Sequence, residues 1–479
     1  MKEYIKGANP YMPLWEHVPD GEPRVFEYQG EKRVYVYGSH DSERTQYCGR
    51  EYVVWSAPVE DLTDWTCHGV SYRTHYDSIL YAPDVVQKGD TFYLYAAEKC
   101  GSLIVVASAK TPWGPFEDPV ETKLGFDPGV LVDEDGKVYA YWGGCAAPCY
   151  IAEMEDDMAT IKADTLVENP LGHSTCPWDP KLNEDGHVSL IDAFFEASSP
   201  RKVLGKYIYL YSRRYEKPVP ELGVFEPCNG FLSYRMSDTP FGPFHDGGDI
   251  SFNGGEILHD AEGVGTMTYR WGNNHGSIME VNGKWYIFYH RQTGTNEYSR
   301  QAMLEPVDVA MGSDGKIYIG DITYRCGEPV SAKPVEMTSQ GPHVNGLDAR
   351  KWISAGYACH IHGGSRRAYI RPEYEQRDDL STPVVDITNG VTVGFRYLQF
   401  GANTPKTVTV VLEKAQKVQV RVRLDSYRGR IVSLLEYDGS ETERTAALDT
   451  GIIGKHAVYF EFLLQDSEET CIFDRFTFD

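Results

Sequence analysis

Four acidic residues recur at similar distances ahead of aromatic, strand-like segments of this chain. They are Glu22, Asp84, Asp127 and Glu196. Each alone would be an ordinary turn or surface carboxylate, but their recurrence indicates equivalent places in successive structural units. Paired carboxylates act as general acid and general base, and the two phenylalanines before Glu196 would desolvate its carboxyl and raise its pKa. The pattern therefore predicts acid–base catalysis in which Glu196 is the acid.

The segments behind these carboxylates share a turn followed by a strand in which aromatic and β-branched residues alternate. The five strands are residues 34–37, 92–95, 138–141, 207–211 and 285–289. Asp-Gly or Asn-Gly before a strand is typical of tight hairpins, because such turns need positive φ. Five hairpins separated by roughly 45–80 residues predict the blades of a five-bladed β-propeller. A propeller gathers one end of every innermost strand around a central depression, where carboxylates from different blades can meet.

A second repeat supports this architecture, and a segment of different composition follows the last repeat. Residues 111–116 (TPWGPF) and 239–244 (TPFGPF) agree at five of six positions. Residues 326–346 are rich in Pro, Gly and Ser and lack periodicity, which indicates a domain boundary. Short strands of period two follow and are typical of a β-sandwich. We therefore expect an all-β protein, with a five-bladed β-propeller over residues 1–330 and a jelly-roll-like β-sandwich over residues 331–479.

Composition and charge narrow the class of function. The chain contains 46 Gly, 27 Pro and 13% aromatic residues, a mixture that favours strands and turns. Its formal net charge of −24 repels phosphate backbones and anionic lipids, so we expect no nucleic-acid or membrane partner. No apolar run approaches the ~18–20 residues of a membrane span, and the opening segment lacks the apolar stretch of a signal peptide, which predicts a cytoplasmic protein. The ten cysteines are expected to be free thiols, because a chain of this length needs no disulfides.

The ordered motifs of the first domain resemble glycoside hydrolase family 43. They are Asn9-Pro10, Glu22-Pro23, Ala82-Pro83-Asp84-Val85, Asp127-Pro128, Phe195-Glu196-Ala197 and Asn274-His275-Gly276-Ser277. The resemblance spans about residues 5–325, and the ordered set is more specific than any single motif. It implies a five-bladed propeller and an inverting hydrolase of arabinofuranosyl or xylosyl linkages in plant polysaccharides. For a cytoplasmic protein we expect exo-acting cleavage of short oligosaccharides, such as fragments of xylan or arabinoxylan.

The same resemblance implies roles for individual residues. Glu196 is the general acid, and Asp84 orients it and tunes its pKa. His275 is the central histidine, which would hold water or a calcium ion near the pocket floor, with a hydrogen-bonded core histidine as the alternative. Arg291 would reach the substrate, unless it forms a salt bridge at a strand end. Asp127 would line the pocket, unless it only shapes a turn.

The residue expected as the general base departs from the family pattern. The family usually has Asp before Pro in the first blade, where this chain has Glu22. An inverting enzyme holds its two carboxyl groups roughly 6.5–9.5 Å apart to leave room for water, and a shifted backbone can absorb one added methylene. Glu22 is therefore the predicted base, with Asp20 and Asp41 as alternatives. Asp41 fits better as a residue that lines the pocket.

The second domain resembles a carbohydrate-binding module of family 6. Residues 389–397, 424–425 and 472–478 carry the resemblance. It implies sugar binding through exposed aromatic side chains, with support of the propeller as the alternative role. Such modules often hold a structural calcium ion, but no ligand set stands out in this sequence. The chemistry itself requires no cofactor.

Two other classes of function use the same fold. A propeller that has lost catalysis would bind sugars without turnover. The change from Asp to Glu at the position of the base would then be the sign of that loss. A propeller used for protein–protein contact would expose large apolar patches and lack a carboxylate cluster. Within the enzyme interpretation, the choice between α-L-arabinofuranosidase and β-xylosidase depends on the shape of the pocket.

Overall fold

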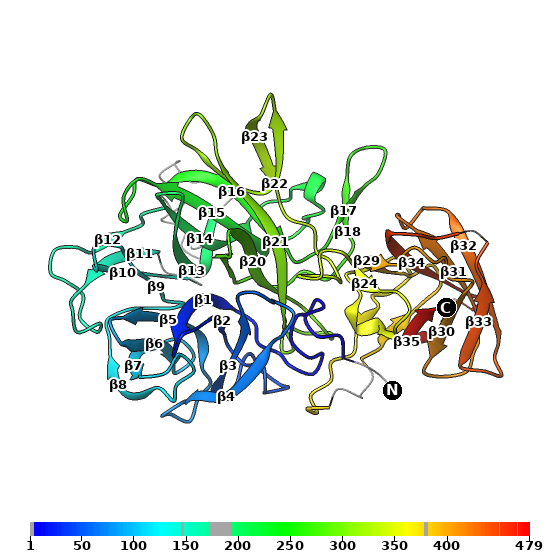
Figure 1. The fold of residues 1–479 in the computed structure, drawn as a ribbon, viewed down its shortest axis with the longest axis horizontal. Helices are drawn as coiled ribbons and strands as arrows, with labels where there is room; N and C mark the ends of the chain where they lie inside the picture. The colour runs from blue at the N-terminus through cyan, green and yellow to red at the C-terminus, as the bar shows by residue number, and fades with distance from the viewer. Residues whose placement is uncertain (1–3, 145–147, 172–192, 378–381, 450, 467) are drawn as a thin grey trace.

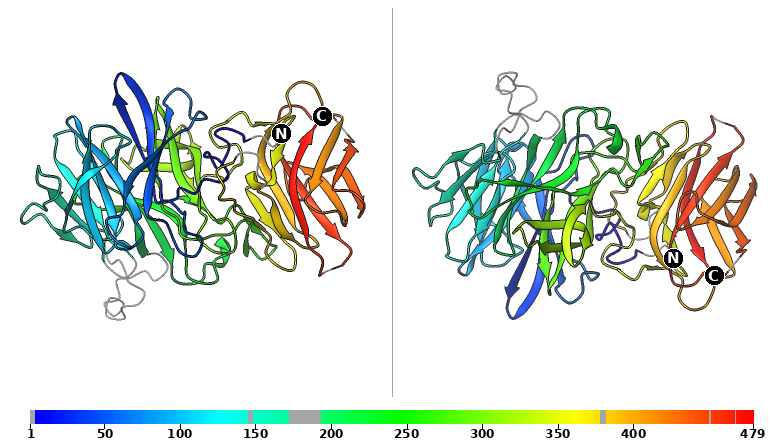
Figure 2. Two further views of the ribbon diagram at one scale, coloured as in Figure 1. Left: turned by 90° about the horizontal axis from the view of Figure 1, so that it is seen from below. Right: turned by 90° about the horizontal axis from the view of Figure 1, so that it is seen from above.

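The protein consists of two β-domains that lie side by side (Figure 1, Figure 2). The computed structural model describes residues 4–144, 148–171, 193–377, 382–449, 451–466 and 468–479. The helices in this part of the chain are short 3-10 turns, η2 (Pro220–Leu222) and η3 (Ala355–Tyr357), and none is long and apolar enough to cross a membrane. The eight cysteines of the described residues are free thiols, whereas Cys145 and Cys176 lie outside them. The predicted all-β class is confirmed.

Five antiparallel sheets of consecutive strands form the first domain. Blade 1 contains β1 (Glu22–Tyr28), β2 (Glu31–Tyr37), β3 (Glu51–Pro58) and β4 (Thr66–Arg73). Blade 2 contains β5 (Tyr81–Lys88), β6 (Thr91–Glu98), β7 (Leu103–Ala109) and β8 (Glu117–Glu121). Blade 3 contains β9 (Gly129–Val132), β10 (Val138–Trp142), β11 (Tyr150–Met154) and β12 (Val167–Glu168). Blade 4 contains β13 (Ala193–Val203), β14 (Lys206–Tyr215), β15 (Cys228–Ser237) and β16 (His245–Phe252), and a small hairpin, β17 (Ile257–His259) and β18 (Gly265–Met267), follows it. Blade 5 contains β19 (Ser277–Val281), β20 (Lys284–Arg291), β21 (Gln301–Met311), β22 (Ile317–Arg325) and β23 (Glu328–Lys333).

The innermost strands of the five blades surround one axis. Strand β1 contacts β5 and β19, and β9 contacts β5 and β13. The hydroxyl groups of Ser199 on β13 and Ser277 on β19 are hydrogen-bonded to each other (2.7 Å), which joins the fourth blade to the fifth. This ring is the predicted five-bladed propeller.

Hairpin turns inside the blades explain why the repeat was readable in the sequence. Gln29 and Gly30, between β1 and β2, have φ of 52° and 82°. Asn282 and Gly283, between β19 and β20, have φ of 49° and 75°. Tight hairpin turns need positive φ at both central residues, and Gly and Asn adopt it at little cost. The repeated TPxGPF phrase connects the third and fourth strands of blades 2 and 4.

Two sheets packed face to face form the second domain. One has the order β24-β29-β34-β31-β32, with β26 beside β29, and the other has the order β27-β28-β35-β30-β33, with β25 beside β35. Aromatic contacts of Phe395 and Phe460 with Phe473 and Phe476 link the two sheets. The strands are β24 (Leu347–Asp348), β25 (Ile353–Ser354), β26 (His360–His362), β27 (Tyr369–Ile370), β28 (Val384–Ile387), β29 (Thr392–Gln399), β30 (Thr407–Leu412), β31 (Lys417–Leu424), β32 (Ile431–Asp438), β33 (Glu443–Ala447), β34 (Lys455–Leu464) and β35 (Cys471–Phe478).

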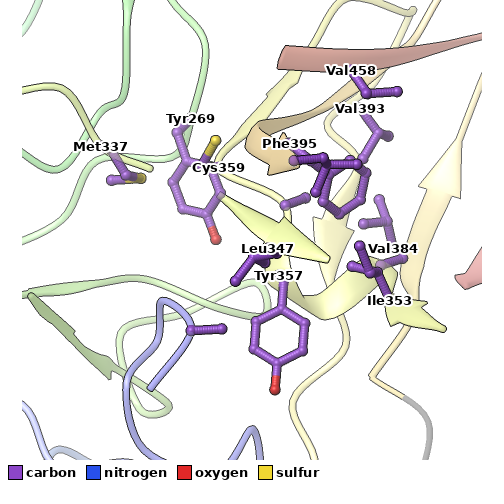
Figure 3. Packing of buried hydrophobic residues seen from close by; sticks show 14 of the residues in the cluster. Tyr269, Met337, Leu347, Ile353, Tyr357, Cys359, Val384, Val393, Phe395 and Val458 are labelled. Carbon is purple, nitrogen blue, oxygen red and sulfur yellow. The ribbon is translucent and has the colours of Figure 1, made fainter. Parts of the chain in front are cut away.

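The two domains share one hydrophobic cluster where they meet. Tyr269 of the propeller and Met337 of the connecting segment lie near Tyr357, Cys359 and Phe395 of the sandwich (Figure 3). All five side chains are buried. A shared core of this kind fixes the sandwich against the propeller, unlike the polar contacts of a loosely tethered module.

Arg291, predicted to reach the substrate, lies in this interface instead. It is the last residue of β20 and is fully buried. Its guanidinium donates hydrogen bonds to the main-chain oxygens of Gly356 (2.5 Å) and Ala358 (2.6 Å) in the sandwich. Successive residues of a strand point to opposite sides, and the preceding His290 faces Asp20 in the propeller, so Arg291 points away from it. The structure corrects the prediction: Arg291 fastens the two domains together.

Replacing Arg291 by Met is expected to lower the free energy of unfolding by about 3 kcal/mol, because it leaves two buried carbonyl oxygens without a donor. Urea denaturation followed by tryptophan fluorescence measures the change. Arg73, whose side chain is mostly exposed, provides the control, and Arg73→Met should change stability by less than about 1 kcal/mol. Unchanged stability of Arg291→Met together with a raised KM would return Arg291 to the substrate.

Candidate active site

All five blades contribute side chains to one cavity near the first residues of the innermost strands. Its volume is about 410 Å³. Aromatic walls come from Tyr47, Tyr81, Phe126, Phe195 and Trp271. The charged groups that matter most for chemistry are Asp20, Asp127, Glu196, His275 and Arg300. Carboxylates from different blades therefore meet at this cavity, as the repeat predicted. Of the four expected carboxylates, Asp127 and Glu196 line it, whereas Glu22 and Asp84 do not.

Asp20 is an ionised carboxylate held in place at the cavity. Ser39 Oγ donates to its Oδ2 (2.6 Å), and Arg300 Nη1 donates to its Oδ1 (3.0 Å). Burial lowers the pKa of His290 to about 4, and the neutral ring accepts a hydrogen bond at Nδ1 from the main-chain N–H of Asp20 (3.2 Å). Burial opposes ionisation of Asp20, but the charges of Arg300 and His275 and the hydrogen bond from Ser39 outweigh it and hold its pKa below the ordinary value. An ionised carboxylate that faces a cavity meets the requirement for a general base.

Glu196 reaches the cavity from an irregular part of β13. The pairing of β13 with β14 shifts register on both sides of Glu196, and Ala197 has a positive φ of 70°. A bulge re-aims one side chain relative to the regular alternation of a strand. The main-chain N–H of Ala197 donates a hydrogen bond to Oδ2 of Asp127 (3.2 Å), which places the two acidic residues next to each other.

Asp127 has a strongly perturbed carboxyl group. Burial raises its pKa, His275 opposes the shift, and the charges of Glu196 and Asp20 add to it. Two carboxyl groups that interact in this way share a proton, so their titration belongs to the pair. A carboxylate beside an acid favours the protonated form of that acid. Asp127, and not Asp84, therefore lies beside Glu196.

Glu22 does not line the cavity. Arg201 Nη2 donates to its Oε2 at 2.5 Å, and Ser199 Oγ donates to the same oxygen at 3.1 Å. Burial opposes its ionisation, but Arg201 and His275 prevail and lower the pKa of Glu22. A buried carboxylate bound to Arg201 is poorly placed to activate a water molecule in the cavity. The geometry thus contradicts the prediction of Glu22 as the base and favours the alternative, Asp20.

Asp84 is also buried away from the cavity. Arg24 donates to both of its oxygens (3.2 and 2.6 Å), and the main-chain N–H groups of Val85 and Val130 donate to one oxygen each (2.7 Å). Arg24, Asp84 and Val130 belong to β1, β5 and β9, so this cluster joins the first three blades. The structure corrects the predicted role of Asp84, because its oxygens hold the propeller together and do not orient Glu196.

Arg300 connects Asp20 to Asp41, which was predicted to line the pocket. Asp41 lies behind Arg300 and accepts hydrogen bonds from its Nε (3.0 Å) and Nη2 (2.8 Å) and from the main-chain N–H of Cys48 (3.0 Å). Asp41 therefore acts on the cavity through Arg300. Sequence reasoning missed Arg300 because it is 280 residues from Asp20 and belongs to no motif.

His275 lies at the centre of the carboxylates, as the motif around it suggested. Its Nδ1 is 3.7 Å from Asp127 Oδ2 and 4.0 Å from Asp20 Oδ1, and its Nε2 is 3.7 Å from Glu22 Oε1. Burial alone would lower its pKa, but these three carboxylates raise it to about 9. The ring is therefore an imidazolium at neutral pH, and it offsets part of the negative charge in the cavity.

Known proteins are similar to this sequence over almost its whole length. The sequence profile described as "Glycosyl hydrolases family 43" matches residues 22–189. A protein of Thermoclostridium stercorarium named "Xylosidase/arabinosidase" is 31% identical over 496 residues, which cover 95% of each chain. The chain belongs to glycosyl hydrolase family 43. The predicted family and the predicted glycoside hydrolase class are thus confirmed.

Other known proteins are similar at lower identity. The "Arabinoxylan arabinofuranohydrolase" of Paenibacillus polymyxa is 27% identical over 509 residues, which cover 94% of this chain and 71% of that protein. A crystal structure of a family 43 arabinoxylan arabinofuranohydrolase from Bacillus subtilis, in complex with cellotetraose, covers 100% of this chain and 98% of its own, with 22% identity and a TM-score of 0.49. The resemblance of the second domain to a family 6 carbohydrate-binding module stays a prediction.

A calcium ion held through water near His275 stays a prediction. Among the described residues, no group of three or more His, Cys, Asp or Glu side chains is placed to hold a metal ion.

Gly144 forms the wall behind Glu196 in the family 43 cavity. Its φ is 150°, and a Cβ atom at this position would lie 2.8 Å from Glu196 Cβ and 3.0 Å from Phe126 Cδ1. Any side chain here must push the acid from its place.

We expect Gly144→Ala to lower kcat by about 10²-fold, since a displacement of about 1 Å is enough for that loss. Steady-state kinetics measure it. Gly136 has a φ of 82° and no neighbouring atom within 4 Å, so Gly136→Ala introduces backbone strain without the contact. Equal losses in the two variants would attribute the effect to strain rather than to displacement of Glu196.

Proposed function

We propose that this family 43 protein is an inverting, exo-acting glycoside hydrolase that releases arabinofuranosyl or xylosyl residues from oligosaccharides of xylan or arabinoxylan. One observation carries the proposal: Asp20, Asp127 and Glu196 come from three blades to one cavity, and Asp20 is held ionised there. The names of the relatives, "Xylosidase/arabinosidase" and "Arabinoxylan arabinofuranohydrolase", support this choice of linkages.

In the proposed mechanism Asp20 is the general base and Glu196 the general acid. Water attacks the anomeric carbon from the face opposite the leaving group, and Asp20 accepts a proton from it. Glu196 donates its proton to the glycosidic oxygen as the bond between carbon and oxygen breaks, so the sugar is released with inverted configuration. Asp127 keeps Glu196 protonated before this step. Exchange with solvent then returns the proton from Asp20 and restores the proton of Glu196.

Hydrolysis of aryl glycosides tests the proposed function. We expect release of nitrophenol from aryl α-L-arabinofuranoside or aryl β-D-xyloside, and NMR of the first product should show the inverted anomer. Product of retained configuration would contradict the roles of Asp20 and Glu196. Absence of turnover, with binding of xylo-oligosaccharides in a calorimetric titration, would instead support a sugar-binding propeller without catalysis.

A further inference from the structure

A second cavity borders the active-site cavity on the side of blade 4. Its volume is about 260 Å³, and its lining residues are Gly223, Val224, Phe225, Glu226, Cys228 and Trp271. Trp271 lines both cavities. The chain between them also contributes to both, because Glu226 and Cys228 line the second cavity whereas Pro227 and Asn229 line the first. The two cavities are therefore neighbours across one rim.

The segment that carries this rim is held rigidly. Val219 and Val224 exchange two main-chain hydrogen bonds (2.9 and 3.2 Å), which close the loop around η2. His259 Nε2 lies 2.8 Å from the main-chain oxygen of Glu221 and ties the loop to β17. Val224 and Cys228 are buried in a hydrophobic cluster to which Trp271 also belongs. A binding surface that is ordered in advance loses little conformational entropy when a ligand binds.

Phe225 stands out because it is exposed on this rigid support. Its exposed fraction is 60%, and its neighbours on the cavity wall are the carboxylate of Glu226 and the indole of Trp271. Pyranose rings offer C–H groups to aromatic faces and hydroxyl groups to carboxylates. A neutral sugar also escapes the repulsion that a net charge of −24 exerts on anions.

The position of the acid indicates which part of the substrate passes over this rim. The leaving-group oxygen must contact Glu196, which lies on β13 of blade 4. Arg214 on β14 and Asn229 on β15 of the same blade continue the cavity wall. The leaving group therefore departs along blade 4, and the loop with Phe225 connects β14 and β15.

We propose that the second cavity is a subsite for the leaving-group side of the substrate, where Phe225 stacks on a pyranose ring of the xylo-oligosaccharide chain beyond the scissile bond. This inference rests on the proposed function, because it takes Glu196 as the acid. It makes the enzyme prefer a substrate with an extended sugar chain over one with a small leaving group.

A comparison of two substrates tests the subsite. Phe225→Ala should lower kcat/KM about 10-fold for arabinoxylo- or xylo-oligosaccharides of three or more units, mainly through KM, because a stacking contact is lost. The kcat/KM for the nitrophenyl glycoside should stay within about 2-fold, since its leaving group carries no pyranose ring to stack on Phe225. Phe225→Tyr should restore most of the loss. Tyr324 is 52% exposed on β22, away from both cavities, so Tyr324→Ala is the matched control and should affect neither substrate.

Two results would overturn the subsite: equal losses for both substrates, or no loss for the oligosaccharide. If the wild type cleaves neither substrate, the proposed function fails, and a calorimetric titration with xylotriose then decides the subsite separately. Binding that Phe225→Ala weakens about 10-fold would uphold the stacking contact. Binding that is absent, or unchanged by the substitution, would refute it.

Discussion

Asp20→Asn is expected to lower kcat by about 10³-fold, with little change in KM for an aryl glycoside. The amide has almost the volume of the carboxylate, its oxygen can still accept the hydrogen bond from Arg300, and its NH2 group can donate to the hydroxyl of Ser39, but it cannot take a proton from water. The loss therefore falls on the chemical step rather than on binding. Initial rates over a range of substrate concentrations measure it, and the melting temperature shows whether the variant is folded.

Glu22→Gln provides the contrast, because it removes a buried carboxylate that does not line the cavity. Arg201 then loses its charged partner inside the propeller, which should lower the free energy of unfolding by about 3–5 kcal/mol. For the folded fraction, kcat should remain within a few-fold of the wild type. A loss of kcat as large as that of Asp20→Asn, at unchanged stability, would return the role of base to Glu22.

The acid limb of the pH profile follows from the same assignment. The charges of Arg300 and His275 and the hydrogen bond from Ser39 overcome the effect of burial and hold the pKa of Asp20 below its ordinary value of 3.8. The ionised form is the active base, so kcat/KM should be constant above this pKa and fall as the pH drops through it. An acid limb centred well above pH 4 would mean that another group is the base.

The fold was readable from the sequence because its signals are local. A turn such as Asn282-Gly283 and the alternating strand after it are determined within about ten residues, and five copies of one unit predict a propeller. The convergence of Asp127 and Glu196 followed from their equivalent places in the blades, whereas that of His275 was implied by the resemblance of its motif to family 43. These features need no knowledge of distant contacts.

The predicted roles of Glu22 and Arg291 were wrong because each role depends on which side of its strand the residue faces. Glu22 and Arg24 are two positions apart on β1 and both enter buried ion pairs, whereas Asp20 precedes the strand, with a φ of 59°. Arg291 similarly points away from His290 toward the sandwich, whose contacts are distant in sequence. The alternation of side chains along a strand shows that residues two positions apart share a face. It does not show which of the two faces meets the cavity.

Glu196→Gln should produce a loss whose size depends on the leaving group. For an oligosaccharide, kcat/KM is expected to fall by about 10³–10⁴-fold, because an alkoxide cannot depart without a proton. For a dinitrophenyl glycoside the loss should stay below about 10-fold, since this phenolate leaves unprotonated. Rates for both substrates, measured on one preparation of the variant, give the ratio directly. Losses of equal size would show that Glu196 does not donate the proton.

The pH profile of Asp127→Asn distinguishes the role of Asp127 from that of the acid, Glu196. The charge of Glu196 adds to the raised pKa of Asp127. Repulsion between two neighbouring carboxylates acts on both groups, so we expect removal of the Asp127 carboxyl group to lower the pKa of Glu196. Glu196 then loses its proton at a lower pH, and the basic limb of kcat/KM for the oligosaccharide should move to lower pH. In Glu196→Gln that limb should vanish, because the amide has no proton to lose. A basic limb that stays in place in both variants would have to come from another group, for which His275, with a pKa of about 9, is the nearest candidate.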